Sequence, residues 1–291
     1  MKPVTRRSFL KAAAASLAVP LIVPRLSFAA PPSGKLQHAA IGVGGQGGYD
    51  LGNIFGSEKA DIVALCDIDE AILKKAAETY PKARLYRDWR EMLDKEEKNI
   101  DSVNVSTPDH THAPAAMNAL RMGKHVFCEK PLTHEVYEAR KLTEMARKKG
   151  VVTQMGIQCH ASDFYRVAVM WLEGGAIGKV KEWHSWSAAI YTTEDKKHPE
   201  GADPIPANVD WDLWLGVAPE RAYKDKLYHP FWWRNWRDFG GGATADFGCH
   251  IFDPVFGGLK IGDPISVKCA ATESQSNEVW PGWTETEYVF P

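Results

Sequence analysis

Short apolar runs alternate with helix-like segments along the first half of this chain. The apolar runs occupy residues 36–43, 61–66, 84–86, 102–105, 125–128 and 151–156. The segments read as helices occupy 49–55, 70–79, 89–93, 113–122 and 137–149. Strands buried on both faces read as continuous apolar runs, and strands separated by helices pair in parallel. The sequence therefore predicts an α/β domain with a doubly wound parallel sheet over residues 36–157.

The pattern changes after Gln158. A helix is expected at 164–173, followed by strands at 180–189, 266–270 and 284–290. These strands indicate a second α/β domain over 158–291, built on an open, mostly antiparallel sheet. Because the last expected strand would leave an unpaired edge, this domain is expected to be truncated.

A glycine-rich turn follows the first apolar run. Gly42, Gly44 and Gly47 form the pattern G-x-G-x-x-G, which lets a backbone approach a pyrophosphate at a helix N-terminus. Asp67 ends the second run, at the distance where a carboxylate accepts ribose hydroxyls and repels a 2′-phosphate. The alternatives are an ordinary glycine turn and a surface aspartate. Together the two features predict a bound dinucleotide and favour NAD over NADP.

Polar residues also follow two later strands. They are Ser106, Thr107, Pro108 and His112 after one strand, and Glu129 and Lys130 after the next. Ligands of parallel sheets sit outside the carboxyl ends of the strands, so these residues are expected to face one crevice. Lys130 there can donate to a substrate hydroxyl oxygen, or act as a base if burial lowers its pKa. The alternative is a solvated lysine.

A second glycine-rich segment, 240–242, leads into Asp246 and His250. Residues four apart share one face of a helix and can form a hydrogen bond. An aspartate in that position can fix the tautomer of a histidine for proton transfer near neutral pH. Such a pair is more often structural than catalytic, so its interpretation depends on Lys130. No metal site is expected, because Asp253 adds only one further ligand.

With these motifs the chain resembles the Gfo/Idh/MocA family of sugar-type oxidoreductases over about residues 36–291. The resemblance is carried by the turn at 42–47, Thr107-Pro108-Asp109 with His112, the run at 123–131, and Asp246-x-x-x-His250. It implies a Rossmann domain and an α/β domain whose open sheet covers the nicotinamide and mediates homo-oligomers. It also implies that Lys130, Asp246 and His250 surround the reacting carbinol. The expected contacts of the cofactor are Gly42, Gly44, Gln46, Gly47, Asp67, Ser106, Thr107, Pro108, His112, Glu129, Lys130 and Gln158.

Aromatic residues dominate the second half, which holds all of the 11 tryptophans except Trp89. Aromatic rings can stack on the apolar face of a pyranose, and neighbouring polar groups can bond its hydroxyls. The expected contacts of a carbohydrate substrate are Tyr191, Tyr228, His229, Trp232, Arg234 and Trp236. The alternative, which is expected for most of the tryptophans, is a place in the core.

The first thirty residues are expected to be a signal peptide. Twin arginines in the segment 5–11 precede a mildly apolar run at 12–23 and small residues near Ala29. The alternative is a basic amphipathic helix. The signal predicts export by the twin-arginine machinery to the periplasm or beyond. Because this route carries folded proteins, a nicotinamide cofactor would be bound before export, held tightly and regenerated within the site.

Three functions stay open on the sequence. A dehydrogenase of a sugar, glycoside or cyclitol would use His250 or Lys130 as base, with Lys130 steadying the alkoxide and Asp246 orienting His250. An NAD-dependent glycosidase would oxidise, eliminate, add water and reduce again, with Tyr191 or Tyr228 as an extra base. A non-catalytic sugar-binding protein is disfavoured, because Lys130, Asp246 and His250 occur together in one sequence.

Charge and cysteine content add two exclusions. The net charge of −2 over 291 residues gives no reason to expect nucleic acid as a partner. The 5 cysteines have no metal-type spacing, and Cys66 and Cys128 stand at the ends of expected strands. They are expected to be free thiols in the core rather than a disulfide framework.

Overall fold

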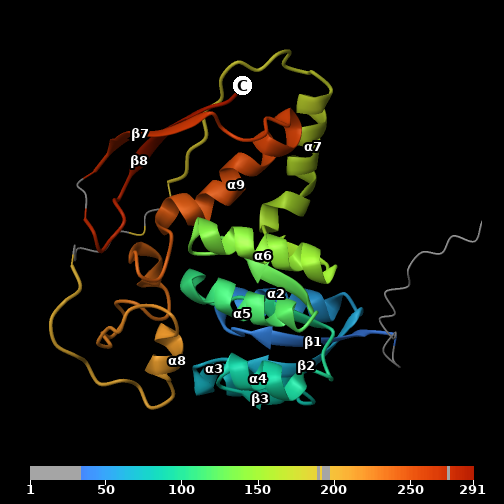
Figure 1. Ribbon diagram of the computed structural model, residues 1–291, viewed down its shortest axis with the longest axis vertical. Coiled ribbons are helices and arrows are strands. Elements are labelled where there is room, and N and C mark those ends of the chain that lie inside the picture. The colour runs from blue at the N-terminus through green and yellow to red at the C-terminus, as the bar shows by residue number, and fades with distance from the viewer. Residues whose placement is uncertain (1–33, 189–190, 192–196, 274–275) are drawn as a thin grey trace, which may run out of the picture. The chain divides into compact units, whose positions relative to one another are not determined.

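Figure 1 shows the computed structural model of the chain, which describes residues 34–188, 191, 197–273 and 276–291. Every element named below belongs to one compact unit, Lys35–Pro291. Among the described residues, no helix has the length and apolar character that a membrane span requires. The expected signal peptide, residues 1–30, lies outside the described residues.

A six-stranded parallel sheet forms the first part of this unit. Its strands are β1 (Leu36–Ile41), β2 (Ala60–Cys66), β3 (Arg84–Tyr86), β4 (Ser102–Val105), β5 (His125–Glu129) and β6 (Thr153–Gly156). Their order is β3-β2-β1-β4-β5-β6, so the direction of winding reverses between β1 and β4. Ile41 pairs with Cys66 on one side and Val105 on the other, which aligns the carboxyl ends of three strands. The predicted doubly wound sheet is confirmed, and ligands of such sheets bind at this switch point.

Five helices connect these strands (Figure 1). They are α2 (Gly45–Gly56), α3 (Glu70–Thr79), α4 (Trp89–Glu96), α5 (Asp109–Arg121) and α6 (Val136–Lys149). The Asp69 carboxylate caps α3 by accepting the backbone N–H groups of Ala71 and Ile72. Two helices begin four residues earlier than expected, α2 at Gly45 and α5 at Asp109. Their first turns carry glycine or polar residues, so the apolar pattern that signals a helix starts only one turn later.

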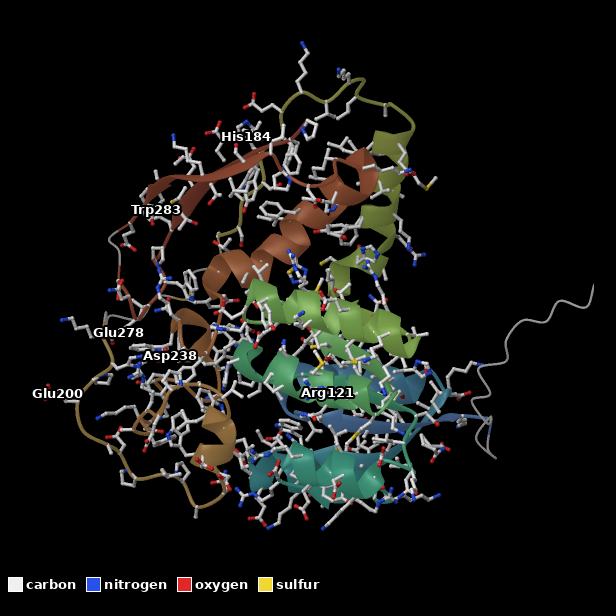
Figure 2. All side chains as sticks on the ribbon, viewed as in Figure 1. Arg121, His184, Glu200, Asp238, Glu278 and Trp283 are labelled. Atoms are coloured by element: carbon white, nitrogen blue, oxygen red, sulfur yellow. The ribbon has the colours of Figure 1, made fainter. Side chains whose placement is uncertain are left out.

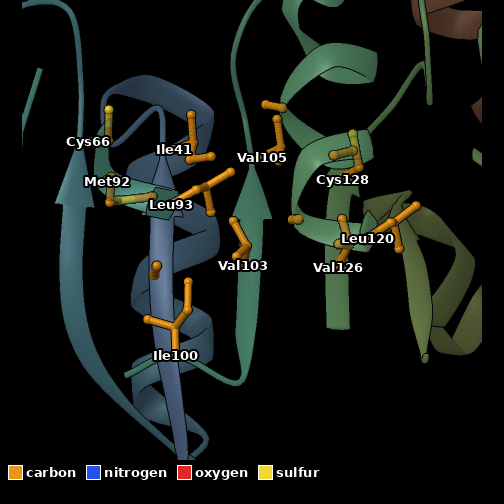
Figure 3. Close-up of a cluster of buried hydrophobic side chains, with 14 of the residues drawn as sticks. Ile41, Cys66, Met92, Leu93, Ile100, Val103, Val105, Leu120, Val126 and Cys128 are labelled. Atoms are coloured by element: carbon orange, nitrogen blue, oxygen red, sulfur yellow. The ribbon is translucent and has the colours of Figure 1, made fainter. Parts of the chain in front are cut away.

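The core of this domain lies between the sheet and its helices. Figure 3 shows Ile41, Val103, Val105 and Val126 from the strands against helix residues that include Leu93 and Leu120. The continuous apolar runs of the sequence therefore reflect strands that are covered by side chains, as expected. The two thiols at the strand ends, Cys66 and Cys128, are buried in the same cluster and form no disulfide.

The second part of the unit is built from helices, long irregular segments and one pair of strands. Its elements are η1 (Gln158–Ala161), α7 (Asp163–Glu173), α8 (Trp211–Leu215), η2 (Trp232–Asn235), α9 (Gly242–Leu259), β7 (Ser266–Thr272) and β8 (Thr284–Val289). The strands pair in an antiparallel sheet, and α7 packs against α9 (Figure 1). An α/β region with an antiparallel sheet after the Rossmann-like sheet is the fold class that the sequence predicts.

The prediction of a strand at 180–189 is wrong for residues 180–188, the part that the structure describes. These residues pair with none of the described strands. Side-chain alternation predicted it, but a strand also needs a neighbour that shares its backbone hydrogen bonds. The segment is held by side chains instead. The Trp183 ring lies 5.2 Å from that of Phe290, and the Ser185 hydroxyl donates to the carbonyl of Ile251.

Residues 197–240 form a separate aromatic core, which we call the aromatic lobe. The buried rings of this lobe belong to Trp211, Trp214, Tyr223, Tyr228, Trp233, Trp236 and Phe239. Trp211 and Trp214 stack with their centroids 4.5 Å apart. Arg221 of the lobe pairs with Asp238 at 2.7 Å, and Asp238 is labelled in Figure 2. Four tryptophans, Trp211, Trp214, Trp233 and Trp236, lie in this core, as the alternative interpretation holds for them. The expectation that most tryptophans are core residues is not met, because the exposed ones include Trp171, Trp186, Trp232 and Trp283.

Candidate active site

The glycine turn between β1 and α2 is shaped for a ligand that approaches the backbone closely. Gly42 has a φ of +79°, and a Cβ on it would lie 2.5 Å from the carbonyl oxygen of Ser106. A Cβ on Gly47 would clash with the carbonyl of Gly42. The N-terminus of α2 follows, with Gly44 as N-cap and no acidic residue in the first turn. Free N–H groups and the helix dipole at this point fit a pyrophosphate.

Asp67 lies beside this turn, at the end of β2. Its carboxylate accepts the backbone N–H of Val43 at 2.9 Å and that of Asp69 at 3.0 Å. Burial raises the pKa of Asp67, and the two N–H donors and the charge of His229 partly offset that effect. A carboxylate held against the glycine turn fits a ribose diol, because its remaining lone pairs can accept hydroxyl groups.

A hydrogen-bonded cluster of acidic and polar residues joins α2 to the ends of β4 and β5. Asp50 accepts the Ser106 hydroxyl at 2.7 Å and the Gln46 amide at 2.9 Å. The same amide reaches Glu129 at 3.4 Å. Burial, and then the charge of Asp50, raise the pKa of Glu129 to about 7. The sequence predicted Gln46, Ser106 and Glu129 as site residues but not Asp50, whose only signal is its place one turn after the glycine pattern.

His112 does not face the crevice. Its ring is buried, with Nδ1 2.8 Å from the carbonyl of Pro131 and Nε2 2.7 Å from that of Thr107. Each ring nitrogen therefore faces a backbone carbonyl, and burial lowers the pKa of the imidazole, whose neutral form donates to one of the two. The expectation that His112 contacts the cofactor is corrected: it links the two strand-end segments that carry Thr107 and Lys130.

Lys130 and Asp246 form an ion pair between β5 and α9. The Lys130 ammonium contacts Asp246 Oδ1, while the Tyr191 hydroxyl donates to Asp246 Oδ2. The side chains of the ion pair are 12% and 8% exposed. Arg234 lies near, with Nε 3.8 Å from Oδ1. Burial and the bond to Asp246 raise the pKa of Tyr191, so this phenol stays protonated at neutral pH. The structure thus brings four predicted site residues together.

Asp109 adds a second carboxyl to this group. It stands at the start of α5, is buried, and accepts the backbone N–H of Gly241 at 3.0 Å. Burial raises its pKa to about 7, the charge of Asp246 adds to the rise, and the cations of Arg234 and Lys130 oppose it. The sequence places Asp109 at the same strand end as Ser106 and therefore in the same crevice, but it is not among the expected contacts of the cofactor or of the substrate.

His250 lies one turn beyond Asp246 on α9, yet no hydrogen bond joins the two. Both oxygens of Asp246 are occupied by Lys130 and Tyr191. Among the described residues, His250 Nδ1 is buried and has no hydrogen-bond partner. Burial, and then the charge of Lys130, lower the pKa of His250, which keeps the ring neutral. The expected orienting bond from Asp246 is therefore absent, and His250 presents an unbonded nitrogen beside the ion pair.

The other expected carbohydrate contacts separate into two groups. Tyr228 and Trp236 are 1% and 0% exposed and belong to the aromatic lobe's core, so a sugar cannot reach them. Tyr228 instead bonds His198 Nδ1 at 2.7 Å. Their prediction as substrate contacts is corrected, because aromatic residues that alternate with polar ones filled a core rather than lining a surface.

His229, Trp232 and Gln158 lie elsewhere. His229 Nε2 is 3.9 Å from a carboxylate oxygen of Asp69, at the end of β2 rather than beside Lys130. Trp232 is exposed and its ring contacts only Phe231 among the described aromatic residues. Gln158 begins η1, directly after β6. Of the expected substrate residues, the structure places only Tyr191 and Arg234 at the ion pair.

Two family models match this chain, and both describe the Gfo/Idh/MocA family. One is described as an oxidoreductase family with an NAD-binding Rossmann fold and matches residues 36–157. The other is described as the C-terminal alpha/beta domain of the oxidoreductase family and matches residues 182–291.

Several curated relatives match part of the chain. Levoglucosan dehydrogenase of Pseudarthrobacter phenanthrenivorans is 27% identical over 129 residues, which cover 43% of this chain and 33% of the relative. Myo-inositol 2-dehydrogenase of Thermotoga maritima is 28% identical and covers 50% and 42%. Glycosyl hydrolase family 109 protein 2 of Bacteroides fragilis is 31% identical and covers 53% and 38%. The chain thus spans less than half of each relative.

The fold has a solved counterpart in GenD2 from gentamicin A biosynthesis, determined in complex with NAD. The TM-score is 0.61 at 20% sequence identity, and the match covers 88% of this chain and 62% of GenD2. This similarity extends through both parts of the unit, so the arrangement of sheet and second domain is a known one.

Proposed function

The chain belongs to the Gfo/Idh/MocA family of oxidoreductases, and we propose that it moves a hydride between a ring carbinol of a sugar, glycoside or cyclitol and NAD. One observation carries the proposal: the Lys130–Asp246 ion pair stands at the carboxyl end of β5, bonded to Tyr191 and beside the unbonded nitrogen of His250. Polar groups that converge on one point of a switch-point crevice are typical of a catalytic site.

The residues present fit a nicotinamide dinucleotide. Gly42 and Gly47 allow the tight turn that leads into α2, because a Cβ on either would clash with neighbouring backbone. The N-terminus of α2 would then receive the pyrophosphate, and Asp67 would accept the ribose hydroxyls. The same carboxylate would repel a 2′-phosphate, which favours NAD over NADP. When bound, NAD supplies the hydride acceptor or donor. Ser106 and Glu129 border the crevice between the glycine turn and Lys130.

The remaining chemistry falls to Lys130 and His250. A neutral His250 with an open nitrogen can take the proton of the substrate hydroxyl, and the Lys130 ammonium can stabilise the alkoxide that develops. Asp246 holds the side chain of Lys130 in place, and it fixes the Tyr191 hydroxyl at the same point. Arg234 adds a cation to the rim of the site and can donate to a substrate hydroxyl.

The mode of action that fits an exported enzyme keeps NAD bound throughout. The twin-arginine pattern at residues 5–11 supports export of the folded chain to the periplasm. Nicotinamide nucleotides are made in the cytoplasm, so the bound NAD would be reduced and reoxidised within one site. The proposal includes a homo-oligomer that forms through the sheet of β7 and β8, where Val267 and Val289 are exposed on opposite faces.

A glycosidase outcome is the second candidate. It is favoured by Tyr191, a hydroxyl placed directly on Asp246, and by the similarity to a glycosyl hydrolase family 109 protein. Oxidation of the carbinol acidifies the adjacent C–H. Loss of that proton expels the glycosidic substituent, water adds to the alkene, and return of the hydride restores the alcohol. The net reaction is hydrolysis, with no net change in NAD.

The test uses the full chain, folded in a cytoplasm, purified and offered a panel of cyclitols, sugars and glycosides. The proposal predicts that one class changes the absorbance of the bound nicotinamide, with a keto product for a dehydrogenase or a free sugar for a glycosidase. Lys130→Met should lower the rate at least about 100-fold. The matched control Lys95→Met removes an exposed lysine of α4 and should keep full activity. Equal rates in both variants would refute the role of Lys130.

A further inference from the structure

The aromatic lobe is attached to the turn between β2 and α3. The backbone N–H of Glu70 donates to the carbonyl of Asn208 at 2.8 Å, and that of Asp210 donates to Ile68 at 3.1 Å. The Asn208 side chain donates to Asp69 Oδ1 at 2.7 Å. This turn begins at Asp67, so the lobe holds the segment that directly follows the proposed ribose contact.

The side chains of the same turn reinforce the attachment. Ile68 packs against the aromatic core of the lobe. Arg87 donates both to the carbonyl of Ile68, at 2.8 Å, and to that of Asn208, at 3.2 Å. His229, also from the lobe, lies 3.9 Å from the carboxylate of Asp69 and is largely buried. The turn and the lobe therefore form one packed unit rather than two surfaces that touch.

The lobe is also attached to the turn between β4 and α5. The buried ring of His110 lies between two lobe carbonyls, 2.9 Å from that of Trp214 and 3.2 Å from that of Phe239. The backbone N–H of Gly241, just beyond the lobe, donates to Asp109 at 3.0 Å. The β2–α3 and β4–α5 turns lie on the two sides of the glycine turn, because β2 and β4 flank β1 in the sheet. With its ribose on Asp67, a bound dinucleotide would have its adenosine half between these two turns.

We infer that the aromatic lobe is a cofactor-retaining clamp. It locks both turns that border the adenosine half of the nucleotide, so the nucleotide leaves only when the lobe detaches from them. The inference rests on the proposed function, since it assumes that a nicotinamide dinucleotide occupies the crevice. In this inference the aromatic lobe makes the cofactor slow to exchange. Neither the glycine turn nor Asp67 explains slow exchange.

The contact between Asn208 and Asp69 offers a direct test. Asn208→Asp places two carboxylates within hydrogen-bond distance, so their repulsion favours detachment of the lobe. Asp69→Asn in the same chain restores an amide–carboxylate pair, and asparagine still caps α3. The matched control is Asn99→Asp, which sets the same repulsion against Glu96 at the end of α4, away from the lobe. Asn208→Ala removes only the side-chain bond and serves if Asn208→Asp does not fold.

The experiment measures the rate at which the full chain, loaded with NADH, releases it into an excess of NAD, by the loss of nicotinamide fluorescence. Hydrogen exchange of the Glu70 amide reports lobe detachment separately. The clamp predicts release at least about tenfold faster in Asn208→Asp, with faster exchange at Glu70. It predicts a smaller acceleration in Asn208→Ala. The double variant should return to within about threefold of the wild type, and Asn99→Asp should release at the wild-type rate.

Three results would overturn the inference. Fast exchange at Glu70 with an unchanged release rate would show that the lobe detaches without freeing the nucleotide, and the proposed function would stand. Equal acceleration in Asn208→Asp and Asn99→Asp would show that general loss of stability controls release. A wild-type chain that takes up no NADH would contradict the proposed function itself, and the clamp with it.

Discussion

The ion pair between Lys130 and Asp246 predicts a strong energetic coupling between β5 and α9. We consider Lys130→Met, Asp246→Asn and the double variant. Each side chain is about one-tenth exposed, so either single change leaves a polar group with its partner lost. Breaking a buried ion pair from one side costs about 3–5 kcal/mol.

The magnitude of the coupling follows from the geometry. In Asp246→Asn, the amide oxygen can still accept from Lys130 and the amide nitrogen can donate to Tyr191, so we expect a loss of about 2–3 kcal/mol. In Lys130→Met, the carboxylate keeps Tyr191 and Arg234, and we expect a similar loss. The double variant leaves neither charge unpaired, so its loss should fall short of the sum by about 2 kcal/mol.

The assay is equilibrium unfolding in urea of the cofactor-free chain, followed by tryptophan fluorescence and by far-ultraviolet circular dichroism. Coincident transitions in the two signals justify a single free energy of unfolding for each variant. A coupling energy near 2 kcal/mol would confirm that the pair joins the two domains. A value below about 0.5 kcal/mol would refute the reasoning, because the two changes would then act independently.

Three further predictions concern other residues. Burial raises the folded-state pKa of Asp109 to about 7, so the free energy of unfolding present at pH 4 falls as the pH rises through 7, by at most about 4 kcal/mol. In urea unfolding at several pH values, Asp109→Asn should reduce this dependence on pH. Part of the dependence should remain, because the pKa of Glu129 is also raised to about 7. Gly47→Ala should abolish retention of nucleotide on gel filtration while Gly52→Ala, which meets no atom, retains it. Trp236→Ala should lower the free energy of unfolding by about 3–5 kcal/mol in urea titrations and leave the KM of the refolded protein unchanged, because the ring is core and not substrate surface.

The Rossmann-like domain was predictable because local pattern and global burial agree there. Its strands are buried on both faces, so each one appears in the sequence as an apolar run between helices. The glycine turn was predictable for a similar reason: Gly42 and Gly47 stand where the backbone leaves no room for a side chain. Both signals can be recognised within a short stretch of sequence, although the need for Gly42 itself arises from the close packing of Ser106 against it.

The site was less predictable because its contacts are long-range. The spacing of Asp246 and His250 shows that they share a helix face, but it does not show that a cation from β5 competes for the carboxylate. The charge of Lys130 and the hydroxyl of Tyr191 occupy both oxygens of Asp246. For the same reason, composition did not predict the location of Trp236. An aromatic-rich segment can line a sugar site or fill a core, and only the packing of distant segments determines which of the two occurs.

The central claim is that this chain carries out its chemistry on a nicotinamide dinucleotide that it retains. The most direct measurement is to purify the folded full chain from a cytoplasm, denature it, and identify and quantify any released nucleotide by mass. The account predicts NAD or NADH at about one molecule per chain. A folded, monodisperse sample that releases no nucleotide would contradict the claim of retention, and NADP would contradict the role given to Asp67.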